Sequence, residues 1–290
     1  MSDNKKSVVI TGASNGFGRA TAEAFLREGW RTFATLRDAS GKNAAAAAAL
    51  RALGADVVEL DVTSDASVDA AAAQIHTAVG AVDVLVNNAG NAFMGVTEAF
   101  TPDAVERQFA TNVIGPVRVN RAFLGAMRER KSGLVVYVSS IVGRSVLPFM
   151  GVYAASKWAI EALAESSSYE LRPFGVDVAI VEPGAYGTNI GESLTTPDDA
   201  ARVASYGEVA NIFGQIGAGL ATASQGKSAD EIARAIVELA KAPAGNRPLR
   251  TMVGGIPQVN EINEHAAPLQ RSILSRFGLD ALLAPETAAV

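Results

Sequence analysis

A tyrosine and a lysine four residues apart, Tyr153 and Lys157, form a pair that can move a proton. Residues at this spacing lie one turn apart on the same face of a helix. A free tyrosine titrates near pH ~10 and is a poor base at neutral pH, but a cation within reach favours the phenolate and lowers that pKa. The pair therefore predicts acid–base chemistry at Tyr153 with its pKa lowered by Lys157, although this spacing is also typical of a simple surface pair.

Two adjacent serines, Ser139 and Ser140, end the strand that is expected before this helix. In an α/β fold, the carboxyl end of a strand and the amino end of the next helix border the crevice that binds ligands. A serine hydroxyl and the Tyr153 phenol are therefore expected to converge there. Because neighbouring residues of a strand point to opposite faces, only one of the two serines can do so.

A glycine-rich turn, TGASNGFG at 11–18, places Gly12, Gly16 and Gly18 between the first expected strand and the first expected helix. Glycines at this place permit a tight turn and the close approach of a pyrophosphate. The helix N-terminus attracts that group through its free N–H groups and the positive end of its dipole. The turn predicts a dinucleotide site, although an ordinary βα turn can look the same in isolation.

Strands and helices alternate along the chain in an order that can bring these motifs together. The expected strands are 7–11, 31–36, 55–60, 82–86, 133–140, 176–181 and 249–253, and the expected helical regions are 19–29, 43–53, 64–79, 102–130, 152–172 and 229–241. Because the strands are apolar at nearly every position, helices should cover both faces of a parallel sheet. The sequence predicts an α/β fold, with one doubly wound domain of about seven strands over residues 1–290.

Two segments depart from this alternation. Residues 187–227, called the flap below, carry no expected strand, and their apolar residues recur at helical spacing: Tyr206, Val209, Phe213, Ile216 and Leu220. The flap is therefore expected to be helical. Residues 256–290 are expected to form a helical C-terminal tail.

The motifs, in their order along the chain, resemble those of the short-chain dehydrogenase/reductase family. The turn matches TGxxxGxG and the helical pair matches YxxxK; the match continues through DVT at 61–63, NNAG at 87–90, Asn112, Ser140 and PGAYGT at 183–188, and covers residues 7–255. ATLRD at 34–38, EPGAYGT at 182–188 and the tail resemble hydroxysteroid and retinol dehydrogenase-like members. The resemblance implies a Rossmann-type fold and an oxidoreductase that interconverts carbonyls and alcohols.

The resemblance implies a role for each of four polar residues. Tyr153 would protonate the carbonyl oxygen in reduction, and Ser140, selected over Ser139 by the family spacing, would hydrogen-bond the same oxygen. Lys157 would hold the nicotinamide ribose and tune Tyr153. Asn112 would support a water-linked proton path, with packing inside a long helix as the alternative.

The cofactor contacts implied by the resemblance are spread over several segments. Asp61 and Val62 would bind adenine, and Thr188 would contact the carboxamide. The full set is Gly12, Ser14, Asn15, Gly16, Phe17, Gly18, Arg37, Asp61, Val62, Asn88, Ala89, Gly90, Tyr153, Lys157, Pro183, Gly184 and Thr188.

The end of the second expected strand bears on the type of cofactor. NAD-preferring relatives place a carboxylate there, which binds the ribose diol and repels a 2′-phosphate. Thr35 stands at that position here, Arg37 can pair with a 2′-phosphate, and Ser14 can add a donor. We expect NADP(H), with NAD(H) as the second option because Asp38 can pair with Arg37; a solvated loop charge is the alternative role for Arg37.

The substrate side is expected to be apolar. By similarity, three segments border the nicotinamide: 91–95, 144–150 and the flap after Thr188. Their apolar members are Phe93, Met94, Val146, Leu147, Pro148, Phe149, Met150, Tyr206, Val209 and Phe213. They favour a hydrophobic ketone or aldehyde, or its alcohol. Arg144 is expected in a solvated loop, with selection of an acidic group as the alternative.

The composition excludes other classes of protein. The chain has no cysteine and two distant histidines, His76 and His265, so neither thiolate chemistry nor a zinc site, nor any other metal site, is expected. A net charge of -5 without a basic cluster argues against nucleic acid as a partner. No apolar run reaches the ~18 residues of a membrane span. The polar start lacks the features of a secretory signal, which favours a cytoplasmic location.

Other functions stay open at this point. A catalytically inactive nucleotide-sensing or scaffold protein can keep the fold without the chemistry. An isomerase or dehydratase would fit better with a TGxxGxxG turn and a longer substrate domain. The tail can cover a surface that shorter relatives use for tetramer contacts, which favours a dimer or a monomer.

Overall fold

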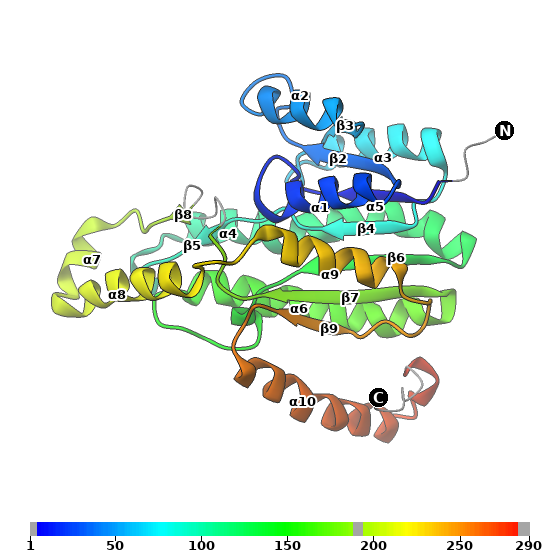
Figure 1. Ribbon diagram of the computed structural model, residues 1–290. Coiled ribbons are helices and arrows are strands. Elements are labelled where there is room, and N and C mark those ends of the chain that lie inside the picture. Colours follow the sequence, from blue (N-terminus) through cyan, green and yellow to red (C-terminus); the bar gives the residue numbers. More distant parts are fainter. Residues whose placement is uncertain (1–4, 188–193, 284–290) are drawn as a thin grey trace.

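The computed structural model describes residues 5–187 and 194–283, and a seven-stranded sheet forms its centre (Figure 1). The strand order is β3-β2-β1-β4-β6-β7-β9, and every neighbouring pair is parallel. The strands are β1 (Ser7–Ile10), β2 (Arg31–Leu36), β3 (Asp56–Glu59), β4 (Val84–Asn87), β6 (Gly133–Val138), β7 (Val176–Pro183) and β9 (Arg250–Val253). The order reverses between β1 and β4, where parallel sheets open a crevice at their carboxyl ends.

Helices cover both faces of this sheet, as the apolar strands predicted. One face is packed by α1 (Gly16–Arg27), α2 (Ala44–Ala52) and α9 (Ala229–Lys241), and the other by α3 (Asp65–Val79), α5 (Gly115–Arg130) and α6 (Gly151–Leu171). The α/β, doubly wound fold expected from the sequence is thereby confirmed.

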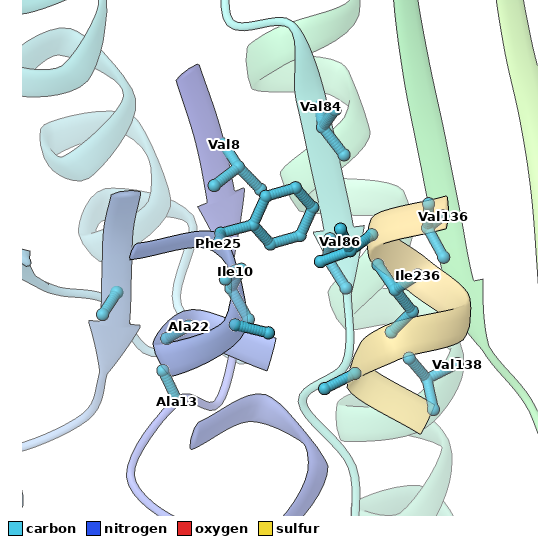
Figure 2. Packing of buried hydrophobic residues seen from close by; sticks show 14 of the residues in the cluster. Val8, Ile10, Ala13, Ala22, Phe25, Val84, Val86, Val136, Val138 and Ile236 are labelled. Atoms are coloured by element: carbon cyan, nitrogen blue, oxygen red, sulfur yellow. The ribbon is translucent and has the colours of Figure 1, made fainter. Parts of the chain in front are cut away.

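The reason for the apolar strands is visible within β1. Val8 and Ile10 point to the face covered by α1 and α9, where they pack with Phe25 and Ile236, as Figure 2 shows. Val9 points to the opposite face and packs with α3 and α5 residues. Side chains of a strand alternate between faces, so a sheet buried on both sides requires an apolar residue at every position.

The long helical region predicted over 102–130 is interrupted by a turn of a different helix type. It consists of α4 (Pro102–Phe109), a π-helical turn (Ala110–Ile114) and α5. Asn112 lies inside that turn and is buried. Single π-helical turns occur frequently at functional sites.

The flap departs from its prediction in one element. It contains a short strand, β8 (Leu194–Thr195), which pairs in parallel with β5 (Ala92–Phe93), so the expectation that it has no strand is wrong. Two residues of strand carry no periodicity that a sequence window can detect. The flap also contains α7 (Ala200–Ser205) and α8 (Glu208–Ala223), which extend away from the sheet at the left of Figure 1.

The tail forms α10 (Pro257–Arg276), which lies beyond β9 at the lower edge of Figure 1. Val259 is its buried residue, and larger apolar side chains such as Leu269 and Phe277 are exposed. Among the described helices, none is both long and apolar enough to cross a membrane.

Candidate active site

A cleft of about 670 Å³ lies at the carboxyl ends of β1, β2, β3, β4 and β6. It brings together thirteen of the residues predicted from the sequence, which come from five separate segments. They are Gly12, Ser14, Asn15, Gly16, Phe17, Arg37, Asp61, Val62, Asn88, Ala89, Gly90, Tyr153 and Lys157. Its place at the switch in strand order, and its size, are those of a small-molecule or cofactor site.

The glycine turn is closed against the loop that follows β4. Gly12 has a positive φ of 69°, and a Cβ at this residue would lie only 2.8 Å from the Cα of Ala89. The Asn88 side chain donates from Nδ2 to the carbonyl oxygens of Thr11, at 2.8 Å, and Gly12, at 3.2 Å. A Cβ at Gly18 would collide with the Gly12 carbonyl oxygen. Gly18 therefore supports the turn from behind and does not line the cleft.

The adenine end of the cleft contains Asp61, whose carboxylate is held within its own turn. Asp61 Oδ1 accepts hydrogen bonds from the backbone nitrogen of Thr63 at 2.8 Å and from its hydroxyl at 2.7 Å. The backbone N–H of Asp61 donates to the Ser67 hydroxyl oxygen at 3.0 Å. Val62 packs against Gly115. These contacts fix the shape of the loop that borders the cleft.

The prediction for Thr35 is wrong. Its side chain is fully buried and its hydroxyl donates to the Ile10 carbonyl oxygen at 3.1 Å, so it points away from the cleft. Leu36 and Arg37 line the cleft instead. The side chain at the end of β2 that faces the cleft is therefore that of Leu36, one residue further along the strand, because successive side chains of a strand face opposite sides.

Besides Asp61, two cations and two carboxylates line this end of the cleft, and only part of this set was identified from the sequence. Lys42 and Glu59 line it together with Arg37 and Asp38. Asp38 does not pair with Arg37: its Oδ2 accepts the backbone N–H of Lys42 at 2.7 Å, and within residues 5–187 and 194–283 neither Arg37 nor Lys42 forms an ion pair. Lys42 lies in the loop directly before α2, close in sequence to Arg37, and this position could have suggested that it also lines the cleft.

At the other end of the cleft, three polar side chains meet at the junction of β6 and α6. Tyr153 and Lys157 lie one turn apart on α6, both buried, and Lys157 Nζ is 5.7 Å from the centre of the Tyr153 ring. Lys157 Nζ donates to the carbonyl oxygen of Val138, the last residue of β6, at 2.9 Å. Ser140 lies two residues beyond β6, and hydrogen bonding by its side chain acts to lower the pKa of Tyr153. The expected convergence of a serine hydroxyl with the phenol is thus present in the structure.

The electrostatics of the pair differ from the sequence-based expectation. Burial raises the pKa of Tyr153 to about 12, and the hydrogen bond with Ser140 offsets only part of that effect. Burial lowers the pKa of Lys157 to about 8, opposed by the charge of Glu161. The Tyr153 pKa is therefore raised in this structure and not lowered as predicted, because desolvation of the phenolate outweighs the hydrogen bonding by Ser140. At neutral pH the phenol holds its proton and Lys157 is mainly an ammonium.

Ser139 and Asn112 have surroundings that differ from that of Ser140. The Ser139 side chain lines the cleft but has no hydrogen-bond partner among the described residues. Asn112 does not line the cleft. Its Nδ2 donates to the Asn91 carbonyl oxygen at 3.0 Å and to the Ser156 hydroxyl oxygen at 3.1 Å. Its Oδ1 accepts a hydrogen bond from the backbone N–H of Asn91 at 3.0 Å. Asn112 thereby fastens the loop after β4 to α6.

The remaining predicted cofactor residues lie apart from this cleft. Pro183 ends β7, and Gly184 donates its N–H to the Val253 carbonyl oxygen at 2.9 Å. A Cβ at Gly184 would collide with the Gly254 carbonyl, so this position packs against β9. Thr188 lies outside the described residues.

The residues predicted for the substrate side lie in two different environments, one near Tyr153 and the flap and one inside the core. Phe149 has a positive φ of 63°, accepts the Gly95 N–H at 2.7 Å through its carbonyl oxygen, and places its ring 6.1 Å from that of Phe213 on α8. Met150 packs beside Tyr153. Phe93 instead packs into a buried cluster with Phe100, so its assignment to the substrate side is wrong.

Arg144 is neither in a solvated loop nor free to select a substrate. Its Nε donates to Asn263 Oδ1 of α10 at 2.7 Å, and its guanidinium lies 5.6 Å from the Trp158 ring centre. Asn263 in turn donates from Nδ2 to Glu182 Oε2 at 2.7 Å. The residue is an anchor for the tail, a contact over long sequence separation that local patterns do not reveal.

Comparison with known proteins agrees with this geometry. The family model described as short chain dehydrogenase matches residues 6–199. Retinol dehydrogenase 8 of Bos taurus is 40% identical over 191 residues, which cover 63% of this chain and 60% of the relative. Estradiol 17-beta-dehydrogenase 1 of Rattus norvegicus is 36% identical over 245 residues, which cover 81% of this chain and 70% of the relative.

A solved structure extends the similarity to nearly the whole chain. The crystal structure of a short-chain dehydrogenase from Streptomyces avermitilis is similar with a TM-score of 0.78 at 34% identity, and the match covers 96% of this chain and 98% of that chain. The chain spans less than two thirds of the length of the retinol dehydrogenase. The predicted resemblance to hydroxysteroid and retinol dehydrogenase-like proteins is confirmed, and the chain belongs to the short chain dehydrogenase family.

Proposed function

We propose that this chain is an NADP(H)-dependent oxidoreductase that interconverts a hydrophobic ketone or aldehyde and its alcohol, with Tyr153 as the general acid and base. The observation that carries the proposal is the meeting of Tyr153, Ser140 and Lys157 beside one end of a cleft built for a dinucleotide. A nucleotide-sensing or scaffold protein has no need of this constellation, because binding alone requires no proton donor.

The lining of the cleft fits a nicotinamide dinucleotide. The glycine turn brings backbone against the loop after β4 and directs the N-terminus of α1 to where a pyrophosphate would lie. Asp61, Val62 and Ala89 would border the adenosine, and Lys157 would hold the nicotinamide ribose. Such a cofactor, when bound, supplies a hydride to the carbonyl carbon or accepts one from the alcohol carbon.

The chain's own residues would handle the proton. In reduction, the Tyr153 O–H donates its proton to the carbonyl oxygen as the carbon receives the hydride, which yields the alcohol and leaves a phenolate. The Ser140 hydroxyl donates a hydrogen bond to the same oxygen and stabilises the charge that develops there. The ammonium of Lys157 stabilises the phenolate until a proton from solvent restores the phenol. Oxidation of the alcohol reverses these steps.

The charge at the adenosine end supports NADP(H) over NAD(H). Leu36 stands where a carboxylate would repel a 2′-phosphate, and Arg37 and Lys42, which form no ion pair with another described residue, both line the cleft. A guanidinium and an ammonium together favour a phosphate through charge-assisted hydrogen bonds. Asp38 and Glu59 reduce that positive potential, so some use of NAD(H) is expected as well.

The surroundings of the reacting end support a hydrophobic substrate. Met150 packs beside Tyr153, and the ring of Phe149 lies near that of Phe213, which belongs to the flap helix α8. A bulky residue with positive φ is rare and is found mainly where surrounding structure demands it, often at functional sites. The names of two relatives refer to retinol and to estradiol, which are apolar alcohols.

The test follows nicotinamide absorbance with NADPH and with NADH, against a panel of hydrophobic aldehydes and ketones. The expected result is turnover that prefers NADPH and falls by about 10²- to 10⁴-fold in Tyr153→Phe, which is the usual contribution of general acid catalysis. Fluorescence titration with NADPH checks that the variant still binds cofactor. Tight NADPH binding by the wild type without turnover of any compound would favour the nucleotide-sensing function instead.

A further inference from the structure

Four side chains follow one face of α6 at intervals of four residues: Tyr153, Lys157, Glu161 and Glu165. The first two belong to the proposed acid–base site. Glu161 is only 2% exposed, and the proposed reaction so far gives it no part. A buried carboxylate is costly unless it is paired, so its place directly after the catalytic lysine calls for a physical reason.

The Glu161 carboxylate is held between β9 and the turn after β6. Its Oε2 accepts from Arg250 Nε at 2.9 Å. On the other side, a Cβ at Gly143 would lie 3.0 Å from Glu161 Cγ and 2.7 Å from Ser139 Oγ, so the absence of a side chain at Gly143 lets both residues approach the turn. Ser139 lines the cofactor cleft. Glu161 therefore lies directly behind the wall of the cleft.

Carboxylates outnumber cations around Arg250. Arg250 Nη2 donates to Glu165 Oε2 at 2.6 Å, and its Nε lies 3.6 Å from Oε1 of the fully buried Glu182 on β7. Arg144, anchored to α10, acts electrostatically on Glu165 and Glu182. Glu161 Oε1 accepts no hydrogen bond from a described residue. Three carboxylates thus share two guanidinium groups.

The next cation along the face of α6 is Lys157, which is itself buried. Burial lowers the pKa of this lysine to about 8, and the charge of Glu161 opposes the effect. Among the described residues, Glu161 is paired with the guanidinium of Arg250 and acts electrostatically on the carboxylate of Glu182, and Glu165 follows it one turn along α6. The negative charge of Glu161 that Arg250 does not neutralise therefore acts on Lys157 and favours its ammonium form.

We propose that Glu161 is a positioning residue for the acid–base site: its buried carboxylate, held by Arg250 one helical turn beyond Lys157, keeps the Lys157 side chain in its ammonium form beside Tyr153. A contribution of Glu161 to catalysis through Lys157 rests on the proposed function. The effect on the lysine itself does not, because it follows from the positions of the two side chains on α6.

The test is an NMR titration of protein labelled with ¹³C at lysine Cε, in which the Lys157 signal is identified by its loss in Lys157→Met. We expect the titration midpoint of Lys157 to fall by about one pH unit in Glu161→Gln, as expected when a nearby opposite charge is removed. Glu165→Gln is the matched control: it also removes a carboxylate bound to Arg250, but one that lies two turns from Lys157, and it should leave the midpoint in place.

A second variant, Glu161→Asp, keeps the charge but moves it, and an intermediate shift is expected; this variant decides the question if Glu161→Gln does not fold. An unchanged midpoint in the Glu161 variants, or an equal shift in Glu165→Gln, would overturn the proposal. If the wild type turns over a carbonyl compound, the alkaline limb of kcat/KM should move to lower pH in Glu161→Gln by the same amount. If it turns over nothing, the proposed function fails while the NMR result still decides the role of Glu161.

Discussion

Hydrogen bonding by the Ser140 side chain acts to lower the pKa of the Tyr153 phenol at the junction of β6 and α6. Ser140 Oγ also accepts the backbone N–H of Val142 at 3.3 Å, which holds the hydroxyl at the start of a helical turn. The hydrogen bond with Tyr153 favours the phenolate, while burial opposes it. The serine is therefore in place both to tune the tyrosine and to meet an oxygen that the tyrosine protonates.

The two adjacent serines should differ strongly in their effect on turnover. We expect Ser140→Ala to lower kcat/KM by about 10- to 100-fold, because it removes a hydrogen bond to a group that carries charge during the reaction. Ser139→Ala is the matched control, since its hydroxyl has no partner among the described residues, and a loss below about threefold is expected. Steady-state kinetics of both variants measure the difference; an equal loss would contradict the assignment of Ser140.

Part of this site could be predicted from the sequence because its residues are linked by local geometry. The spacing of Tyr153 and Lys157 on one helix, and the glycine turn between a strand and a helix, depend on periodicities that a sequence displays directly. The order of alternating elements then placed these motifs at one edge of a parallel sheet. The parallel sheet and the helices on both of its faces followed from the same pattern.

The features that were missed depend on exact register or on distant contacts. Which of Thr35 and Leu36 faces the cleft depends on the strand's pleat, and an error of one residue reverses the face. The pairing of Arg144 with Asn263 joins residues that lie 119 positions apart. The pKa of Tyr153 depends on how completely the fold buries the phenol, a quantity that the spacing to Lys157 does not contain.

The choice of cofactor should depend on Arg37 and Lys42 together. We expect Arg37→Ala to raise the Kd for NADPH by about 10- to 100-fold, since a charge-assisted hydrogen bond to the 2′-phosphate contributes on the order of 1.5–3 kcal/mol. Lys42→Ala should have a smaller effect in the same direction, because an ammonium offers no bidentate geometry. Fluorescence titrations with NADPH and NADH measure both.

The affinity for NADH supplies the control for this prediction. NADH has no 2′-phosphate, so its Kd should change by less than about threefold in either variant. Arg51→Ala, at an arginine of α2 that does not line the cleft, should leave both affinities unchanged. Parallel losses for NADPH and NADH in Arg37→Ala would indicate a change in the shape of the loop and would remove the argument for a phosphate site.

A methyl group at Gly18 should disrupt the cofactor turn. In Gly18→Ala the new Cβ would collide with the Gly12 carbonyl oxygen and with the Asn88 amide that clamps the same turn. Overpacking of this kind costs about 1–3 kcal/mol, so we expect a lower melting temperature and a large loss of NADPH affinity. Gly125→Ala in α5, where a Cβ meets open space, should instead be neutral or stabilise by up to about 1 kcal/mol. Thermal unfolding with and without NADPH distinguishes the two, and similar behaviour of both variants would contradict the clamp.

Glu182 should make the stability of the fold depend on pH. Burial, followed by the charge of Glu161, raises its pKa to about 7, against the opposing effects of Asn263, Arg250 and Arg144. A carboxyl group with a raised pKa in the folded state binds its proton more tightly there than in the unfolded chain. Its contribution is therefore fully present below its ordinary pKa near 4.5 and is lost as the pH rises through about 7.

The free energy of unfolding should accordingly fall by on the order of 2 kcal/mol between pH 5 and pH 8 on account of Glu182. Glu182→Gln removes the ionisation but keeps an oxygen that can accept the Asn263 N–H, so its stability should change less over this range. Glu238→Gln, at a carboxylate that is 67% exposed, controls for loss of a negative charge and should follow the wild type. Urea unfolding at pH 5, 6, 7 and 8 measures all three. If Glu182→Gln keeps the slope of the wild type, the pH dependence arises elsewhere, and the carboxylate of Glu182 is stabilised in its charged form by Arg250 and Asn263 more strongly than its burial opposes it.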